Sequence, residues 1–290
     1  RPPPKEEQLP IVNEVWSEIG AMSSVKNYAV VAAQYVRFLA IDFTYVEVGK
    51  LLKDLVRRVV PNKAYVDLQP QLLSVVTALL ETATDFGELF SLEPFLKLLA
   101  CFEGAQAEAN NRKLLDAFAK SSASCSDPLL INNLLHVARQ LHDSIDSLSF
   151  ADERRQLSAL INAFIRKVSF GRDLERHLDF FVECRAAFPN LEAVMDTLVL
   201  GVIKMAMDTF AAVRGRHTPR TSAFAKACVA YCFITIPSIE SPRLRVNLNL
   251  LTAQAALCNH LLPQMEACVK AAVTGVPEAL DVNGVGVGVG

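Results

Sequence analysis

The chain has 290 residues, of which 51% are hydrophobic and 21% charged, and its formal net charge is −2. This apolar content excludes a disordered chain, and the near-neutral charge provides no overall basic field for nucleic acid or anionic lipid. The longest apolar stretches fall short of the about 20 residues that cross a bilayer, because Lys204 and Lys226 interrupt them.

Helical periodicity is visible in the first third of the chain. Residues 25–39 place Tyr28, Val31, Tyr35 and Phe38 on one stripe, which is the spacing of an amphipathic helix. Helical patterns continue to about residue 120, and no motif in that region indicates a particular chemistry.

The clearest helix is predicted over residues 127–145. Asp127 followed by Pro128 is typical of an N-cap with proline at the first helical position. The apolar residues then recur at steps of three and four along the segment: Leu130, Leu134, Val137, Leu141 and Ile145.

Further helical patterns follow at residues 157–168, 174–188, 191–213, 224–235 and 244–258. Residues 244–250 alternate like a strand, but the wider stripe of Leu244, Leu248 and Leu251 favours a helix. We expect about twelve or thirteen helices in the whole chain and no strand.

The later helices recur at a regular interval. Alternate helices are expected to begin near residues 128, 172, 220 and 263, a spacing of roughly 43–48 residues that is typical of two-helix HEAT repeats. The predicted fold is therefore all-α, a HEAT-like α-solenoid of antiparallel helix pairs. Such stacking explains the high apolar content, because each helix contacts several neighbours.

The predicted organisation has three parts. Residues 1–10 are expected to form a linker or cut end, residues 11–275 the α-solenoid, and residues 276–290 a flexible Gly/Val tail. Because the sequence opens without Met and closes in Gly-Val repeats, we expect a fragment of a longer protein.

The polar chemistry is sparse. Cys228 and Cys232 share one helix face without further ligands at zinc spacing, so they are interpreted as small core residues. His177 is expected on a helix surface. No nucleophile or base has a recognisable partner spacing, and the sequence therefore predicts no catalytic residue, no metal site and no cofactor.

The strongest local charge lies in the turn that contains Arg214, Arg216 and Arg220. One interpretation is a contact site for an acidic protein or a phosphoinositide headgroup. The alternative is a group of cations at a helix C-terminus followed by a solvated turn.

From residue 127 the sequence resembles the large scaffold subunit of the endosomal retriever complex, a retromer-scaffold-like vacuolar sorting protein family. The likeness is most specific in Ala-Cys-Val-Ala-Tyr-Cys-Phe-Ile-Thr-Ile-Pro-Ser at residues 227–238. It extends over roughly residues 127–278, with further matches at residues 127–137, 142–144, 170–175, 181–186 and 190–192. Family scaffolds are much longer than this chain.

The resemblance implies a non-enzymatic scaffold in endosome-to-plasma-membrane recycling. Its implied partners are the arrestin-fold and metallophosphoesterase-fold subunits of retriever, coiled-coil components of the Commander assembly and a cargo-adaptor sorting nexin. It also implies a cytoplasmic protein that reaches the endosome membrane peripherally, through its partners, without cofactors or nucleic acid.

Three charged residues in the matched segments are candidate protein contacts: Arg172, Glu183 and Arg185. A charge is not needed to fill a core, which favours a role at an interface. Their alternative role is local, as salt bridges between adjacent repeats or as solvated helix surface.

Two other functions stay open from the sequence. One is a different HEAT-like adaptor or coat-type scaffold of vesicle transport. The other is an all-α enzyme, which predicts a deep pocket lined by converging acid, base or metal ligands.

Overall fold

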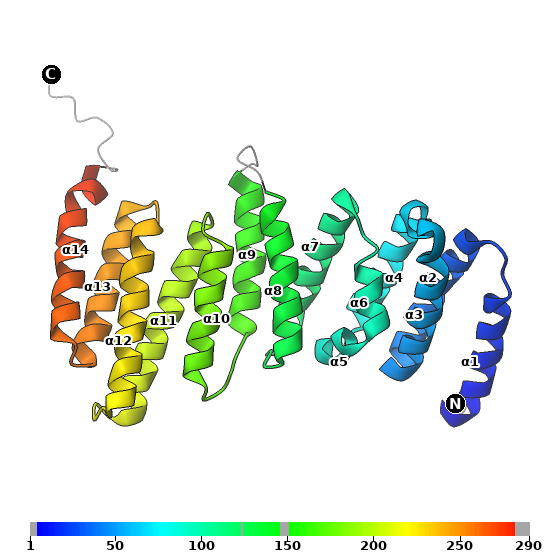
Figure 1. Cartoon of the computed structure of the whole chain (residues 1–290), viewed down its shortest axis with the longest axis horizontal. Coiled ribbons are helices and arrows are strands. Elements are labelled where there is room, and N and C mark those ends of the chain that lie inside the picture. Colours follow the sequence, from blue (N-terminus) through cyan, green and yellow to red (C-terminus); the bar gives the residue numbers. More distant parts are fainter. Residues whose placement is uncertain (1–4, 123, 146–150, 282–290) are drawn as a thin grey trace, which may run out of the picture. The chain divides into compact units, whose positions relative to one another are not determined.

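The computed structural model describes residues 5–122, 124–145 and 151–281, and they form helices connected by short turns (Figure 1). Fourteen α-helices and two 3-10 helices lie within these ranges, and no strand is found there. The all-α prediction is confirmed. The chain divides into two compact units, residues 1–147 and residues 148–290, and each is described by itself.

The first unit consists of two layers of helices. Helices α2, α4 and α7 pack in sequence in one layer, while α3 packs on α6 and α5 on α8 in the other. The elements are α1 (Lys5–Gly20), α2 (Val25–Asp42), α3 (Tyr45–Val59), the 3-10 helix η1 (Pro61–Leu68), α4 (Gln69–Thr82), α5 (Phe86–Ser91), α6 (Glu93–Leu99), α7 (Gly104–Lys120) and α8 (Pro128–Asp143).

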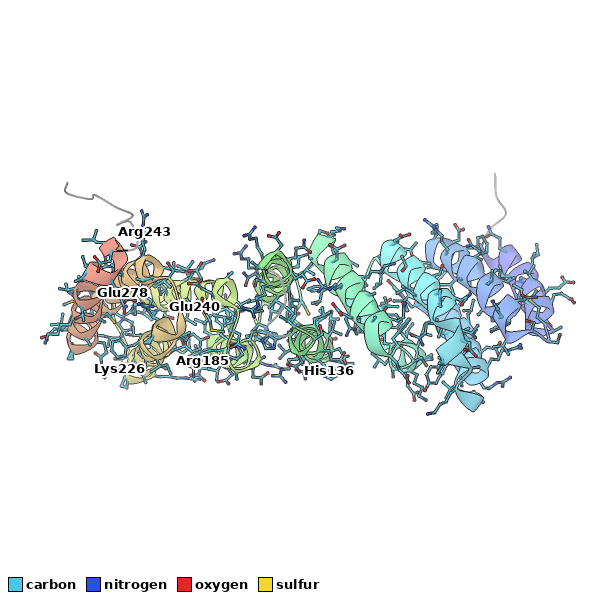
Figure 2. All side chains as sticks on the ribbon, turned by 90° about the horizontal axis from the view of Figure 1, so that it is seen from above. His136, Arg185, Lys226, Glu240, Arg243 and Glu278 are labelled. Carbon is cyan, nitrogen blue, oxygen red and sulfur yellow. The ribbon has the colours of Figure 1, made fainter. Side chains whose placement is uncertain are left out.

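The second unit has the same two-layer design. Helix α11 packs against α9 and α13 in one layer, and α10, α12 and α14 form the other, as the end-on view in Figure 2 shows. The elements are α9 (Ala151–Lys167), α10 (Leu174–Ala187), α11 (Glu192–Val213), α12 (Pro219–Thr235), the 3-10 helix η2 (Ile236–Ser238), α13 (Pro242–Cys258) and α14 (Leu262–Asp281).

The predicted repeat is confirmed at the level of helix starts. Helices α8, α10, α12 and α14 begin at Pro128, Leu174, Pro219 and Leu262, close to the expected interval. The strand-like segment at residues 244–250 lies inside α13, where Ser241 caps the helix and Pro242 begins it. Leu248, Thr252 and Ala255 form its buried stripe, as a period of 3.6 requires.

Helices extend beyond both predicted boundaries of the solenoid. Helix α1 begins at Lys5 and includes Pro10, which lies beyond its first turn and removes one backbone hydrogen bond. Helix α14 continues through Pro277 to Asp281, so residues 276–281 are helical. The remainder of the predicted Gly/Val tail, residues 282–290, lies outside the described residues.

Buried asparagines connect helices of the second unit. Asn162 Nδ2 donates to the Ala193 carbonyl at 3.0 Å, and Asn259 Nδ2 donates to the Ala206 carbonyl at 3.3 Å. Both contacts reach α11 from other elements, and Asn259 is only 2% exposed. Breaking either hydrogen bond would leave a buried N–H group without a partner, which is costly, so these contacts fix how neighbouring helices align.

In the described part of the chain, no helix is both long and apolar enough to span a membrane.

Candidate protein-interaction surface

The basic turn that follows α11 has a defined backbone. Arg214 adopts the left-handed conformation, with φ of 52°, and Gly215 follows with φ of 72°. The Gly215 amide donates to the Phe210 carbonyl at 3.1 Å, which is the closing hydrogen bond of a Schellman-type helix end. The turn therefore holds the Arg214 and Arg216 side chains outside the core, and both are exposed.

Arg214 and Arg216 differ from the third arginine of this segment. Within residues 151–281, neither of the two has an ion-pair partner. Arg220, in the first turn of α12, instead binds Glu175 of α10 through two hydrogen bonds, Nε to Oε1 at 2.9 Å and Nη2 to Oε2 at 2.8 Å. Arg220 therefore has a local role between neighbouring helices, which neither interpretation of the basic segment included.

The Arg220–Glu175 pair has electrostatic consequences. The hydrogen bonds from Arg220 lower the pKa of the Glu175 carboxyl, and the same contacts raise the pKa of the Arg220 guanidinium. Both side chains are largely exposed, at 80% and 55%, so water and salt screen the interaction. The pair therefore contributes little to the free energy of folding, and its main effect is to fix the register between α10 and α12.

Arg172 lies beside this pair. It is exposed in the turn before α10 and lines a hollow of about 300 Å³ together with Asp173, Glu175, Arg220 and Thr221. The structure thus brings Arg172 and Arg220 together, although 48 residues separate them in sequence. Because Asp173 and Glu175 line the same hollow, its charge is mixed rather than purely basic.

Arg185 is half-buried between α10 and α12, where Figure 2 labels it. Its Nη1 donates to Thr235 Oγ1 at 3.2 Å, and its guanidinium carbon lies 5.6 Å from the centre of the Tyr231 ring. The Tyr231 hydroxyl in turn donates to the Phe181 carbonyl at 3.0 Å, and burial raises the Tyr231 pKa. Arg185 thus joins two neighbouring helices.

Glu183 lies on the same helix but is exposed. It has no ion-pair partner among the described residues of the second unit. Of the six candidate residues, four therefore present charge to the exterior, namely Arg172, Glu183, Arg214 and Arg216. The other two, Arg185 and Arg220, are occupied in contacts between helices.

His177 was expected on the helix surface, and it is partly buried there. Its ring lies 4.8 Å from the centre of the Phe181 ring and 5.8 Å from that of Phe170. Burial lowers its pKa, so the neutral imidazole is the form that the fold prefers. The sequence suggested a surface position because charged residues surround His177, but the aromatic partners come from the preceding turn and the next helical turn.

His260 is a neighbour of the basic turn that the sequence did not indicate. The rings of His217 and His260 approach edge to face with centres 6.4 Å apart. These residues belong to two different interhelical turns, after α11 and after α13. No local pattern could have indicated this pair, since the stacking of the helix pairs creates it.

The cysteines are core residues, as predicted. Six of the seven are buried, and Cys258 is partly buried. Burial raises the pKa of Cys228 to about 12 and that of Cys125 to about 11, so these thiols are protonated and weakly nucleophilic. No group of three or more metal-ligating side chains occurs in the described ranges.

Comparison with known proteins identifies related sequences. The family model described as the VPS35L C-terminal domain matches residues 1–285. A curated relative from Dictyostelium discoideum, a VPS35 endosomal protein sorting factor-like protein, is 42% identical over 276 residues. Its human counterpart is 41% identical over 278 residues, and that from Drosophila melanogaster is 36% identical over 280 residues.

These alignments cover nearly all of this chain but a small part of each relative. They include 95% of the chain for the first two proteins and 96% for the third. They include only 28%, 29% and 29% of the relatives' own lengths. The chain therefore spans less than a third of the curated proteins that it matches.

Proposed function

Because this chain belongs to the VPS35L C-terminal domain family, we propose that it is a non-enzymatic scaffold segment in endosomal protein sorting. In this proposal it is part of a retromer-like retriever complex, which returns cargo from endosomes to the plasma membrane. The observation that carries the proposal is the 41–42% identity to endosomal protein-sorting factor-like proteins over 95% of the chain. Proteins this similar over such a length share a fold. The two-layer helical units of this chain are consistent with a scaffold fold.

The proposed mechanism is multivalent presentation of surface. Stacked helix pairs expose one edge of every repeat, so affinity can arise from several modest contacts. The proposed partners are the arrestin-fold and metallophosphoesterase-fold subunits of retriever, coiled-coil Commander components and a cargo-adaptor sorting nexin. Through them the protein would associate peripherally with the cytoplasmic face of endosomes.

The exposed charges of the second unit are the proposed contact residues. Arg214 and Arg216 extend from a rigid turn and have no internal carboxylate partner in residues 151–281. Arg172 and Glu183 are exposed as well. Arginine is favoured at interfaces because its planar group donates several directed hydrogen bonds.

Affinity capture with the full-length protein tests the proposal. We expect it to retain both the arrestin-fold and the metallophosphoesterase-fold subunits of retriever. Recovery of neither subunit would contradict the retriever assignment. Preferential capture of retromer's arrestin-like subunit would instead support a different adaptor or coat-type scaffold.

A charge-reversal variant refines the test. R172E/R214E/R216E places three acidic groups on the proposed surface, and we expect it to reduce capture of at least one subunit by about tenfold. K26E/K113E/K120E is the matched control, because it changes the net charge equally at exposed positions of the first unit.

A further inference from the structure

A groove lies between α3, η1 and α6 of the first unit. Its volume is about 850 Å³, within the range of about 300–1,000 Å³ that is typical of sites for small ligands. None of the six candidate residues of the second unit contributes to it.

The groove results from the way the chain leaves α3. Val60 and Pro61 end the helix, and the chain then continues as η1, in which Lys63 adopts a left-handed conformation with φ of 54°. A 3-10 helix is narrower than an α-helix, so η1 does not fill the space beside α6. Tyr65 forms one wall, and its hydroxyl donates to Glu103 Oε1 at 3.3 Å.

The floor and mouth of the groove are apolar. Val56 and Cys101 lie at the base and are 8% and 4% exposed. Val60 lies at the mouth, where it is 45% exposed. Contact with an apolar side chain would remove Val60 from water, which is favourable by the hydrophobic effect.

Positively charged side chains from two helices line the groove. They are Lys53, Arg57 and Lys97, with Glu93 as the one lining carboxylate, while Asp54 and Glu103 contact Arg57 and Tyr65 from beside it. Glu93 Oε1 lies 2.7 Å from Lys97 Nζ, and Arg57 has only a longer contact of 3.6 Å to Asp54. Lys53 has no ion-pair partner among the described residues of the first unit.

The two sides of the groove are close enough to interact. The pKa of the Glu93 carboxyl is lowered first by its hydrogen bond with Lys97, and Lys53 on α3 adds to that lowering. The cations of α3 and α6 therefore act on the same space. A negatively charged group placed between them would meet positive charge from both helices.

We propose that this groove binds a short acidic peptide segment of a partner protein, with one large apolar side chain inserted over Val56 and Val60. Acidic residues on either side of that anchor would face Lys53, Arg57 and Lys97. The apolar floor favours a peptide over a membrane surface, because a polar headgroup would leave Val56 and Val60 without an apolar partner. This inference does not rest on the proposed retriever assembly.

Binding of two immobilised peptide pools to the full-length protein tests the proposal. In one pool, aspartate and glutamate alternate with leucine, isoleucine, phenylalanine and tryptophan, and in the other, lysine and arginine replace the acids. We expect retention on the acidic pool only, with affinity that decreases as salt is added.

Variants locate the binding site. K53E/R57E/K97E should weaken binding to a selected acidic peptide by about tenfold or more, and Val60→Asn, which adds no charge, should weaken it at unchanged rim charge. K53R/R57K/K97R keeps the charge and should retain binding. K26E/K113E/K120E alters the net charge equally outside the groove, and it should bind like the parent. Circular dichroism confirms that each variant is folded.

Three results would overturn the proposal. The first is equal retention on the basic pool or no retention on the acidic pool. The second is unchanged affinity in K53E/R57E/K97E. The third is binding to phosphatidylserine-containing vesicles that depends on the same three cations, since this would identify a lipid headgroup rather than a peptide. None of these results would bear on whether the full-length protein captures the retriever subunits.

Discussion

Gly201 of α11 leaves room for the ring of Phe181 on α10. A Cβ atom at this position would lie 2.7 Å from Phe181 Cε2 and 2.9 Å from Phe181 Cζ. Phe181 is itself buried against His177, so its ring cannot move aside easily. The sequence gives no sign of this contact, because a glycine inside an apolar helix pattern indicates only a missing side chain.

Replacing this glycine should be costly. We expect Gly201→Ala to lower the free energy of unfolding by about 1–3 kcal/mol through overpacking, as measured by urea denaturation. Gly49→Ala in α3 is the control, since its Cβ would meet Leu92 Cδ2 at an ordinary 3.4 Å. That variant should be neutral or stabilising by up to about 1 kcal/mol. Equal effects in both variants would contradict the close contact.

His177 makes stability dependent on pH. Its pKa is lowered in the folded chain by burial, whereas an unfolded histidine titrates near about 6.5. As pH decreases below that value, the unfolded state binds the proton first, so stability should decrease between pH 7 and pH 5.

Replacing His177 isolates this contribution. His177→Phe should remove part of the decrease, which thermal unfolding at the two pH values can measure. An unchanged difference between the two melting temperatures would exclude His177 as its source.

At the scale of elements, the helices and their order could be predicted because apolar periodicity and caps are local signals. Asp127 and Pro128 indicated the start of α8, and the structure confirms the cap. The break between α5 and α6 at Leu92 and Pro94, and the 3-10 path of η1, were not anticipated. Both depend on packing against α3, a tertiary effect that propensity alone does not contain.

The cap of α8 can be tested directly. Asp127 accepts hydrogen bonds from the amides of Leu129 and Leu130 at 3.1 and 3.4 Å. We expect Asp127→Ala to destabilise the protein by about 1 kcal/mol, whereas Asp127→Asn keeps the acceptor and should lose less. A larger loss for the asparagine variant, seen in chemical denaturation, would contradict the capping role.

The turn after α11 provides a second test of an element boundary. A non-glycine residue in the left-handed conformation of Arg214 costs roughly 1–2 kcal/mol, part of which glycine would recover. Arg214→Gly should therefore raise the melting temperature slightly. Arg216→Gly should not, because Arg216 is absent from the left-handed positions of the turn. Stabilisation by the Arg216 change alone would contradict this backbone assignment.

For the whole molecule, the all-α fold and the repeat interval could be predicted from local periodicity. The division into two compact units could not, because periodicity reports how each helix faces its neighbours and not how helix pairs group. The single solenoid expected over residues 11–275 stays a prediction. Of the candidate surface, charge identified Arg214 and Arg216, but only the tertiary structure distinguishes them from the occupied Arg185 and Arg220.

The central claim is that this chain is part of a scaffold with several partners. Light scattering coupled to size exclusion, on the full-length protein mixed with the arrestin-fold and metallophosphoesterase-fold subunits of retriever, tests it most directly. We expect one species whose mass equals the sum of the three proteins, and reduced assembly for R172E/R214E/R216E. Elution of the full-length protein apart from both subunits would contradict it.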